Sequence, residues 1–175
     1  MASVTRWLSV RLKLKVNPAK SAVAPAGKRR FLSFAFTGAA QPRRRIAPEA
    51  LARLRQKVRA ITRRTRGISL EAMTAQLARY LAGWRGYFGF CQTPSVLRTL
   101  DHWIRRRLRC VAWKPWKRWY TRLGELRKRG VPRELAAQTA TSAHGPWRLA
   151  KSPALHLALP NAYFTALHLP SLAAP

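Results

Sequence analysis

Acidic side chains are the scarcest feature of this sequence. The 175 residues include 35 lysines and arginines but only five acids, which are Asp101, Glu49, Glu71, Glu125 and Glu134. Nucleotidyl transfer by two metal ions requires paired carboxylates, and no two of these acids stand at a chelating spacing. Glu49, Glu71 and Glu134 instead fall near expected helix N-termini, where they suit the macrodipole. We therefore expect no catalytic residues, no metal site and no cofactor.

Cysteines and long apolar runs are also scarce. Cys91 and Cys110 are far apart and form no CxxC pattern, which excludes a zinc-ligand set or a disulfide framework. We expect buried free thiols in a reducing cytoplasm. No apolar run reaches 18 residues, and the N-terminus has no apolar signal-peptide core, so we expect neither a membrane span nor secretion.

Positive charge dominates what is present. The formal net charge is +30 and the pI is about 12.0, while 47% of the residues are apolar. The apolar content supports a packed core and excludes a disordered basic tail. Such a self-repelling fold favours a polyanionic partner, with nucleic acid the first candidate and an anionic membrane surface the second. Arginine outnumbers lysine, which favours RNA, although a GC-rich genome would also favour arginine codons.

Two segments near the N-terminus resemble strands. Apolar and basic residues alternate over residues 10–16, which predicts a half-buried strand. Residues 31–36 predict a second strand, with Leu32, Phe34 and Phe36 on one face and Phe31 on the other. Together they indicate a short β-hairpin within residues 1–37, followed by a linker over residues 38–45.

The rest of the chain has helical periodicity. Apolar stripes predict helices that begin at Pro48, Leu70, Pro94, Trp116 and Pro132, with Ser69 and Thr93 as N-caps. Recurring prolines make the tail irregular from residue 142 onward. The expected fold class is mainly α, a multi-helix bundle preceded by a β-hairpin and followed by an irregular tail. We divide this part into a helical domain over residues 46–130 and a C-terminal helix and tail over residues 131–175.

The densest basic segment runs from Arg105 to Arg122 and contains Trp113, Trp116 and Trp119. Cations interleaved with aromatic rings can bind phosphate and stack on bases together. Alternatively, the tryptophans belong to the core and the cations are merely solvated. Arg63, Arg64 and Arg66 form a second patch at a helix end, where cations also suit the macrodipole.

Three long segments of the sequence carry a resemblance to a known protein family. Residues 45–119, including "RGISLEAMTAQLARYLAGWRGYFGFCQTPSVLRTLDHWIRRRLR", are similar to the maturase-specific region, called domain X or thumb, of bacterial group II intron reverse transcriptase/maturases. The tail "GPWRLAKSPALHLALPNAYFTALHLPSL" resembles the C-terminus of that family. The segments "LKLKVNPAKSAV" and "RRFLSFAFTG" resemble the last palm strands. The family usually has Phe-Leu-Gly where this chain has Phe31-Leu32-Ser33, which puts close backbone packing at Ser33 in doubt.

The resemblance implies that the chain binds group II intron RNA and stabilises its catalytic fold for splicing. The family's fingers, palm and Tyr-x-Asp-Asp motif are absent, so we expect a truncated maturase without reverse transcriptase activity. Carried over by motif and charge, the expected RNA-binding residues are Arg63, Arg64, Arg66, Arg105, Arg106, Arg107, Arg109, Lys114, Trp116, Lys117 and Arg118.

Three alternatives remain open at this point. The chain is a non-functional remnant of a reverse transcriptase gene, or a subunit acting in trans with a separate polymerase half that docks on the Phe31–Phe36 strand, or a membrane-surface protein. DNA is a further candidate partner. Without RNA or a partner over the apolar surface near residues 31–36, we expect aggregation or association.

Overall fold

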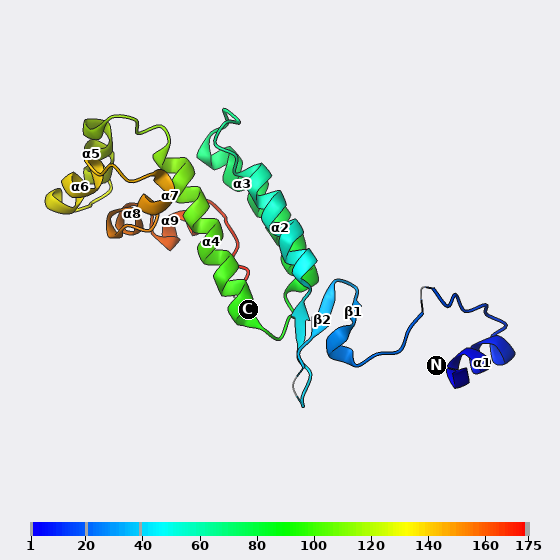
Figure 1. The fold of residues 1–175 in the computed structure, drawn as a ribbon. Coiled ribbons are helices and arrows are strands. Elements are labelled where there is room, and N and C mark those ends of the chain that lie inside the picture. Colours follow the sequence, from blue (N-terminus) through cyan, green and yellow to red (C-terminus); the bar gives the residue numbers. More distant parts are fainter. Residues whose placement is uncertain (1, 20, 39, 174–175) are drawn as a thin grey trace. The chain divides into compact units, whose positions relative to one another are not determined.

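The computed structural model describes residues 2–19, 21–38 and 40–173, and it divides into two compact units, Met1–Ala47 and Pro48–Pro175 (Figure 1). The first unit holds a small antiparallel sheet, and the second consists of helices and ends in an irregular tail. This confirms the predicted fold class. No helix among the described residues is long and apolar enough to cross a membrane.

The first unit begins with a helix where a strand was expected. Helix α1 (Ala2–Arg11) is followed by residues without strand structure, so the strand predicted over residues 10–16 is wrong. A two-residue alternation specifies a strand when one face is buried. Val10, Leu12 and Leu14 are instead 69%, 51% and 55% exposed.

A tight hairpin replaces the single strand predicted at residues 31–36. After the 3₁₀ turn η1 (Ala26–Lys28), strand β1 (Arg30–Phe31) pairs antiparallel with β2 (Phe34–Phe36), and Phe31 lies opposite Phe34. Leu32 and Ser33 form the turn with φ angles of 48° and 64°, as a two-residue type I′ connection requires. Leu32 therefore shares no strand face with Phe34 and Phe36. Ser33 occupies a left-handed conformation that glycine adopts more readily.

A third strand completes the sheet. Strand β3 (Arg44–Ile46) pairs with β2, so the last two residues of the predicted linker, Arg44 and Arg45, lie in the sheet. Phe34, Ala35 and Ile46 are buried and form the core of this unit. The backbone N–H of Ala47 donates to the Ser33 carbonyl at 2.9 Å, which ties the end of β3 to the hairpin turn.

Three long helices form the body of the second unit. They are α2 (Pro48–Ile61), α3 (Leu70–Phe88) and α4 (Pro94–Trp113); α2 packs against α3, and α3 against α4 (Figure 1). Most of each predicted stripe is buried, which confirms the periodicity: Leu54, Val58 and Ile61 on α2, Met73, Leu77, Leu81, Trp84 and Phe88 on α3, and Leu97, Leu100, Ile104 and Leu108 on α4.

The helices that follow are shorter. They are α5 (Trp119–Lys128), α6 (Arg133–Ala140), α7 (Pro146–Leu149), α8 (Pro153–Ala158) and α9 (Asn161–Ala166). Prolines at the first positions of α7 and α8 break the tail into these pieces. Leu155, Leu159 and Phe164 are buried, so the tail supplies part of the core.

Asp101 attaches the end of the tail to α4. Its buried carboxylate accepts hydrogen bonds from the Ser171 hydroxyl at 2.7 Å and from the backbone N–H groups of Leu172 and Ala173 at 3.0 and 3.2 Å. Asp101, the only aspartate of the sequence, therefore has a structural role, because it holds the end of the tail against α4.

Candidate nucleic-acid interface

The fold brings two of the predicted basic segments together. Beyond α2, Gly67 adopts a φ of 69° and turns the chain toward α3. The Arg66 guanidinium donates to the Ile61 carbonyl at 2.8 Å, which closes this loop onto the helix end. Lys114, just beyond α4, donates from Nζ to the Arg64 carbonyl. Segments about fifty residues apart in sequence therefore meet at one end of the helical body.

A pocket of about 510 Å³ lies where these segments meet. The cations that line it are Arg63, Arg64, Lys114, Lys117 and Arg129. The first four are exposed, whereas Arg129 forms an ion pair with Glu125. Glu71 is the acid among the described lining residues. The net charge of the pocket lining is strongly positive, as a phosphate-binding surface requires. We call this region the basic pocket.

Exposed aromatic rings lie at the start of α5. Trp119 and Tyr120 are 57% and 51% exposed, and their rings meet edge to face with centroids 6.0 Å apart. The Arg118 guanidinium donates to the Tyr120 hydroxyl at 2.7 Å. Because Arg118 and Lys117 immediately precede these rings, cation and aromatic surface adjoin, as in proteins that bind single-stranded nucleic acid.

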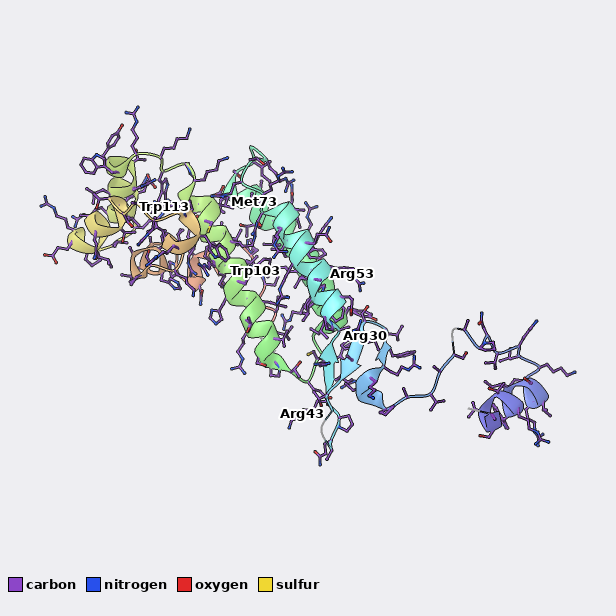
Figure 2. All side chains as sticks on the ribbon, viewed as in Figure 1. Arg30, Arg43, Arg53, Met73, Trp103 and Trp113 are labelled. Carbon is purple, nitrogen blue, oxygen red and sulfur yellow. The ribbon has the colours of Figure 1, made fainter. Side chains whose placement is uncertain are left out.

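Trp116 was expected among the RNA-binding residues, with a place in the core as the alternative, and the structure buries its ring. Trp116 lies before α5 and is 6% exposed. Its ring packs edge to face on Trp113 with centroids 5.4 Å apart (Figure 2 shows Trp113), and the Arg129 guanidinium lies 4.8 Å from its centroid. The turn after α4 directs this ring into the core, so Trp116 and Trp119 share no helix face.

Arg109, also expected among the RNA-binding residues, is 4% exposed. Its Nε donates to the Leu159 carbonyl at 3.0 Å, and its guanidinium lies 5.6 Å from the Phe164 ring centroid. Burial, and then the neighbouring Arg105, lower the pKa of this guanidinium. These contacts attach the C-terminal tail to α4 through Arg109.

The other arginines of this run are partly exposed and partly engaged. Arg106 donates from Nε and Nη2 to the Trp147 carbonyl at 3.1 and 2.7 Å. Arg107 donates from Nε to the Thr62 hydroxyl at 2.7 Å. Arg105 has a buried Nε without a hydrogen-bond partner. A helix distributes consecutive positions around its axis, so these residues do not present one phosphate-binding face.

Sequence reasoning missed Trp147 and Arg148, which were treated only as part of the tail. Trp147 is 42% exposed, and its ring centroid lies 3.8 Å from the Arg106 guanidinium carbon. The available signal was an adjacent Trp-Arg pair after Gly145-Pro146, the same combination of ring and cation that singled out the α4–α5 turn.

The thiols offer no reactive group in this region. Both cysteines are free, with Cys110 buried and Cys91 half-buried. Burial raises the pKa of the Cys110 thiol, and nearby Arg64, Arg106 and Arg107 oppose that shift. A raised pKa keeps the thiol protonated at neutral pH. No group of three or more His, Cys, Asp or Glu side chains that could hold a metal ion occurs among the described residues.

Comparison with known families identifies the helical region. Residues 51–130 match the family model for the group II intron, maturase-specific domain. This stretch of the chain is therefore similar to group II intron maturase-specific domains. No curated protein matches the chain. The matched region spans from the first turn of α2 to the residue after Arg129, so it includes the cations of the basic pocket and the exposed rings of α5.

Proposed function

We propose that the maturase domain binds group II intron RNA and stabilises its folded form for splicing, without reverse transcriptase activity of its own. The observation that carries the proposal is the convergence on one pocket of four cations of the matched region, Arg63, Arg64, Lys114 and Lys117. Neutralising RNA phosphates at these cations would release counterions and relieve the mutual repulsion of the protein's charges. Trp119 and Tyr120 would stack on unpaired bases beside them.

A double variant of the basic pocket tests this proposal. Arg63→Gln with Lys117→Gln removes two exposed cations from the pocket, so binding to intron RNA should weaken at all salt concentrations. The slope of log K against log salt should fall by about one for each lost phosphate contact. The measurement is a binding titration of the purified chain over a salt series.

The matched control removes the same charge elsewhere. Lys57 on α2 and Arg79 on α3 are exposed and do not line the basic pocket. The Lys57→Gln, Arg79→Gln variant should keep both affinity and slope near those of the parent. Equal losses in the two double variants would mean that only net charge attracts RNA, which contradicts a dedicated surface.

The first unit favours a second candidate role, as a docking element for a separate polymerase subunit. Phe31 and Leu32 at the β1–β2 hairpin are 70% and 65% exposed, and β1 is an edge strand of the sheet. An open edge with apolar side chains invites strand pairing with another chain. A polymerase subunit that co-purifies with the parent chain but not with the Phe31→Lys variant would support this role. A parent chain that purifies alone as a monomer would argue against it.

A further inference from the structure

A second pocket, of about 420 Å³, shares Arg64 and Val111 with the basic pocket. Its walls come from α4, the end of α2 and the start of α7, and they include Arg107, Cys110, Val111, Trp147 and Arg148. We call it the Trp147 pocket. Its volume falls in the range of sites that hold small ligands.

The indole of Trp147 packs against a neighbouring guanidinium. Arg106 contacts this residue twice, because its guanidinium lies 3.8 Å from the ring centroid and also donates two hydrogen bonds to the Trp147 carbonyl. The ring remains 42% exposed. A preorganised aromatic wall stacks on a flat ligand with little loss of side-chain entropy.

The inner part of the Trp147 pocket is apolar, and its polar groups are already engaged. The Cys110 thiol donates to the Pro146 carbonyl at 3.3 Å. The Thr62 hydroxyl donates to the Val58 carbonyl at 2.6 Å and accepts from Arg107 Nε at 2.7 Å. Few hydrogen-bonding groups remain to distinguish one base from another. A ligand would therefore be held by stacking, with little sequence preference.

The cations of this pocket lack an acidic counterpart. Arg64, Arg107 and Arg148 line it, and none of its described lining residues is acidic. Burial lowers the pKa of the Arg107 guanidinium, as do the positive charges of Arg59 and Arg64. An anion between these guanidinium groups would relieve the repulsion and accept bidentate hydrogen bonds.

A flat aromatic wall beside three cations fits a nucleotide. We propose that the Trp147 pocket receives one unstacked nucleotide of the bound RNA, with its base against the indole and its phosphate among the Arg64, Arg107 and Arg148 side chains. This inference rests on the proposed RNA-binding function and adds a single-nucleotide subsite to it. The expected ligand is an unpaired residue, because a paired base remains inside its own stack.

The test compares Trp147→Leu and Trp147→Phe in the full-length chain. The probes are an intron RNA hairpin with an unpaired loop, the same hairpin with abasic loop nucleotides, and fully paired RNA of equal length. Loss of one base–aromatic stack should weaken binding of Trp147→Leu to the unpaired-loop hairpin by about tenfold. Trp147→Phe should restore most of that affinity. Neither variant should change binding to the abasic hairpin or to paired RNA.

Trp7→Leu is the matched control, because this 55% exposed indole belongs to α1 and lies outside the pocket lining. Circular dichroism of each variant verifies folding. If Trp147→Leu binds the unpaired-loop hairpin as tightly as the parent, the subsite is refuted while the proposed function stands. If the parent chain shows no preference for intron RNA over duplex DNA, the proposed function itself fails.

A titration with adenosine monophosphate separates the two sources of this ligand chemistry. Weak binding that competes with the unpaired-loop hairpin supports a nucleotide within RNA. Tight, saturable binding that leaves RNA affinity unchanged would assign the pocket to a free nucleotide and overturn the inference.

Discussion

Asp101 shows how a single residue can be misjudged when only its neighbours in sequence are considered. It lies among arginines on α4, yet its carboxylate accepts hydrogen bonds from residues 70 to 72 positions later, at the end of the tail. Sequence reasoning excluded it from a metal site but assigned it no role. Helical periodicity identifies which face of a helix is apolar, and it does not identify which distant backbone groups need an acceptor.

Replacing the Asp101 carboxylate should therefore destabilise the fold. Asp101→Asn removes the charge and places an amide beside buried N–H donors, so the free energy of unfolding should fall by about 2–3 kcal/mol. Urea denaturation measures it. Glu134→Gln, at an exposed position in the first turn of α6, should change the same quantity by less than about 0.5 kcal/mol. Equal stability of Asp101→Asn and the parent would show that the tail is held by packing alone.

The arginine run of α4 gives the same lesson for the candidate site. Charge density selected residues 105–109, but the tail covers Arg109 completely enough to leave it 4% exposed. The loop cations Arg63 and Arg64 and the turn cation Lys117 are exposed, as a binding role requires. Composition alone could not separate buried arginines from exposed ones. Their exposure depends on which helix residues the C-terminal tail covers.

Among the elements, the long helices follow from the sequence, and the short segments do not. Amphipathic stripes on α2, α3 and α4 predicted their buried faces because one side of each helix supplies the core. The strand at residues 10–16 failed because alternation there has no buried face. The hairpin at Leu32–Ser33 was missed because neither residue is a glycine or asparagine, which usually mark such turns. The start of α5 was placed three residues early, at Trp116.

The two predicted N-caps offer a test at this scale. The Ser69 hydroxyl accepts from the Ala72 N–H at 3.1 Å, whereas Thr93 makes no side-chain cap hydrogen bond and contacts the Cys91 sulfur instead. Ser69→Ala should lower the free energy of unfolding by about 1 kcal/mol. Thr93→Ala should lower it by markedly less. Thermal denaturation of both variants measures these changes. A larger loss of stability for Thr93→Ala than for Ser69→Ala would contradict the assignment of Ser69 as the N-cap that forms a side-chain hydrogen bond.

At the scale of the whole molecule, the chain has two cores that use different secondary structure. Phe34, Ala35 and Ile46 form one, while the stripes of α2, α3 and α4 and the buried tail residues form the other. The region that matches the maturase-specific family model and the C-terminal tail lie in the second unit. Two residues of the predicted linker, Arg44 and Arg45, belong to strand β3 of the first unit.

A fragment of residues 48–175 should therefore fold without the first unit. Its helices and tail contain their own core and the Asp101 contacts, so we expect one cooperative thermal transition within a few degrees of that of the intact chain. It should also retain the RNA affinity that depends on the basic pocket. A fragment with helical circular dichroism but no cooperative transition would show that the sheet unit is needed for packing of the helices.

The most direct test of the account is a competition experiment on the full chain over a salt series. Labelled group II intron RNA is bound first, and unrelated structured RNA or duplex DNA is added as competitor. Binding to every polyanion should weaken as salt rises, because counterion release contributes to each. The account predicts that intron RNA keeps an advantage at high salt, where shape-dependent contacts and stacking persist. Parallel loss of binding to all three nucleic acids would leave only charge attraction and contradict intron recognition.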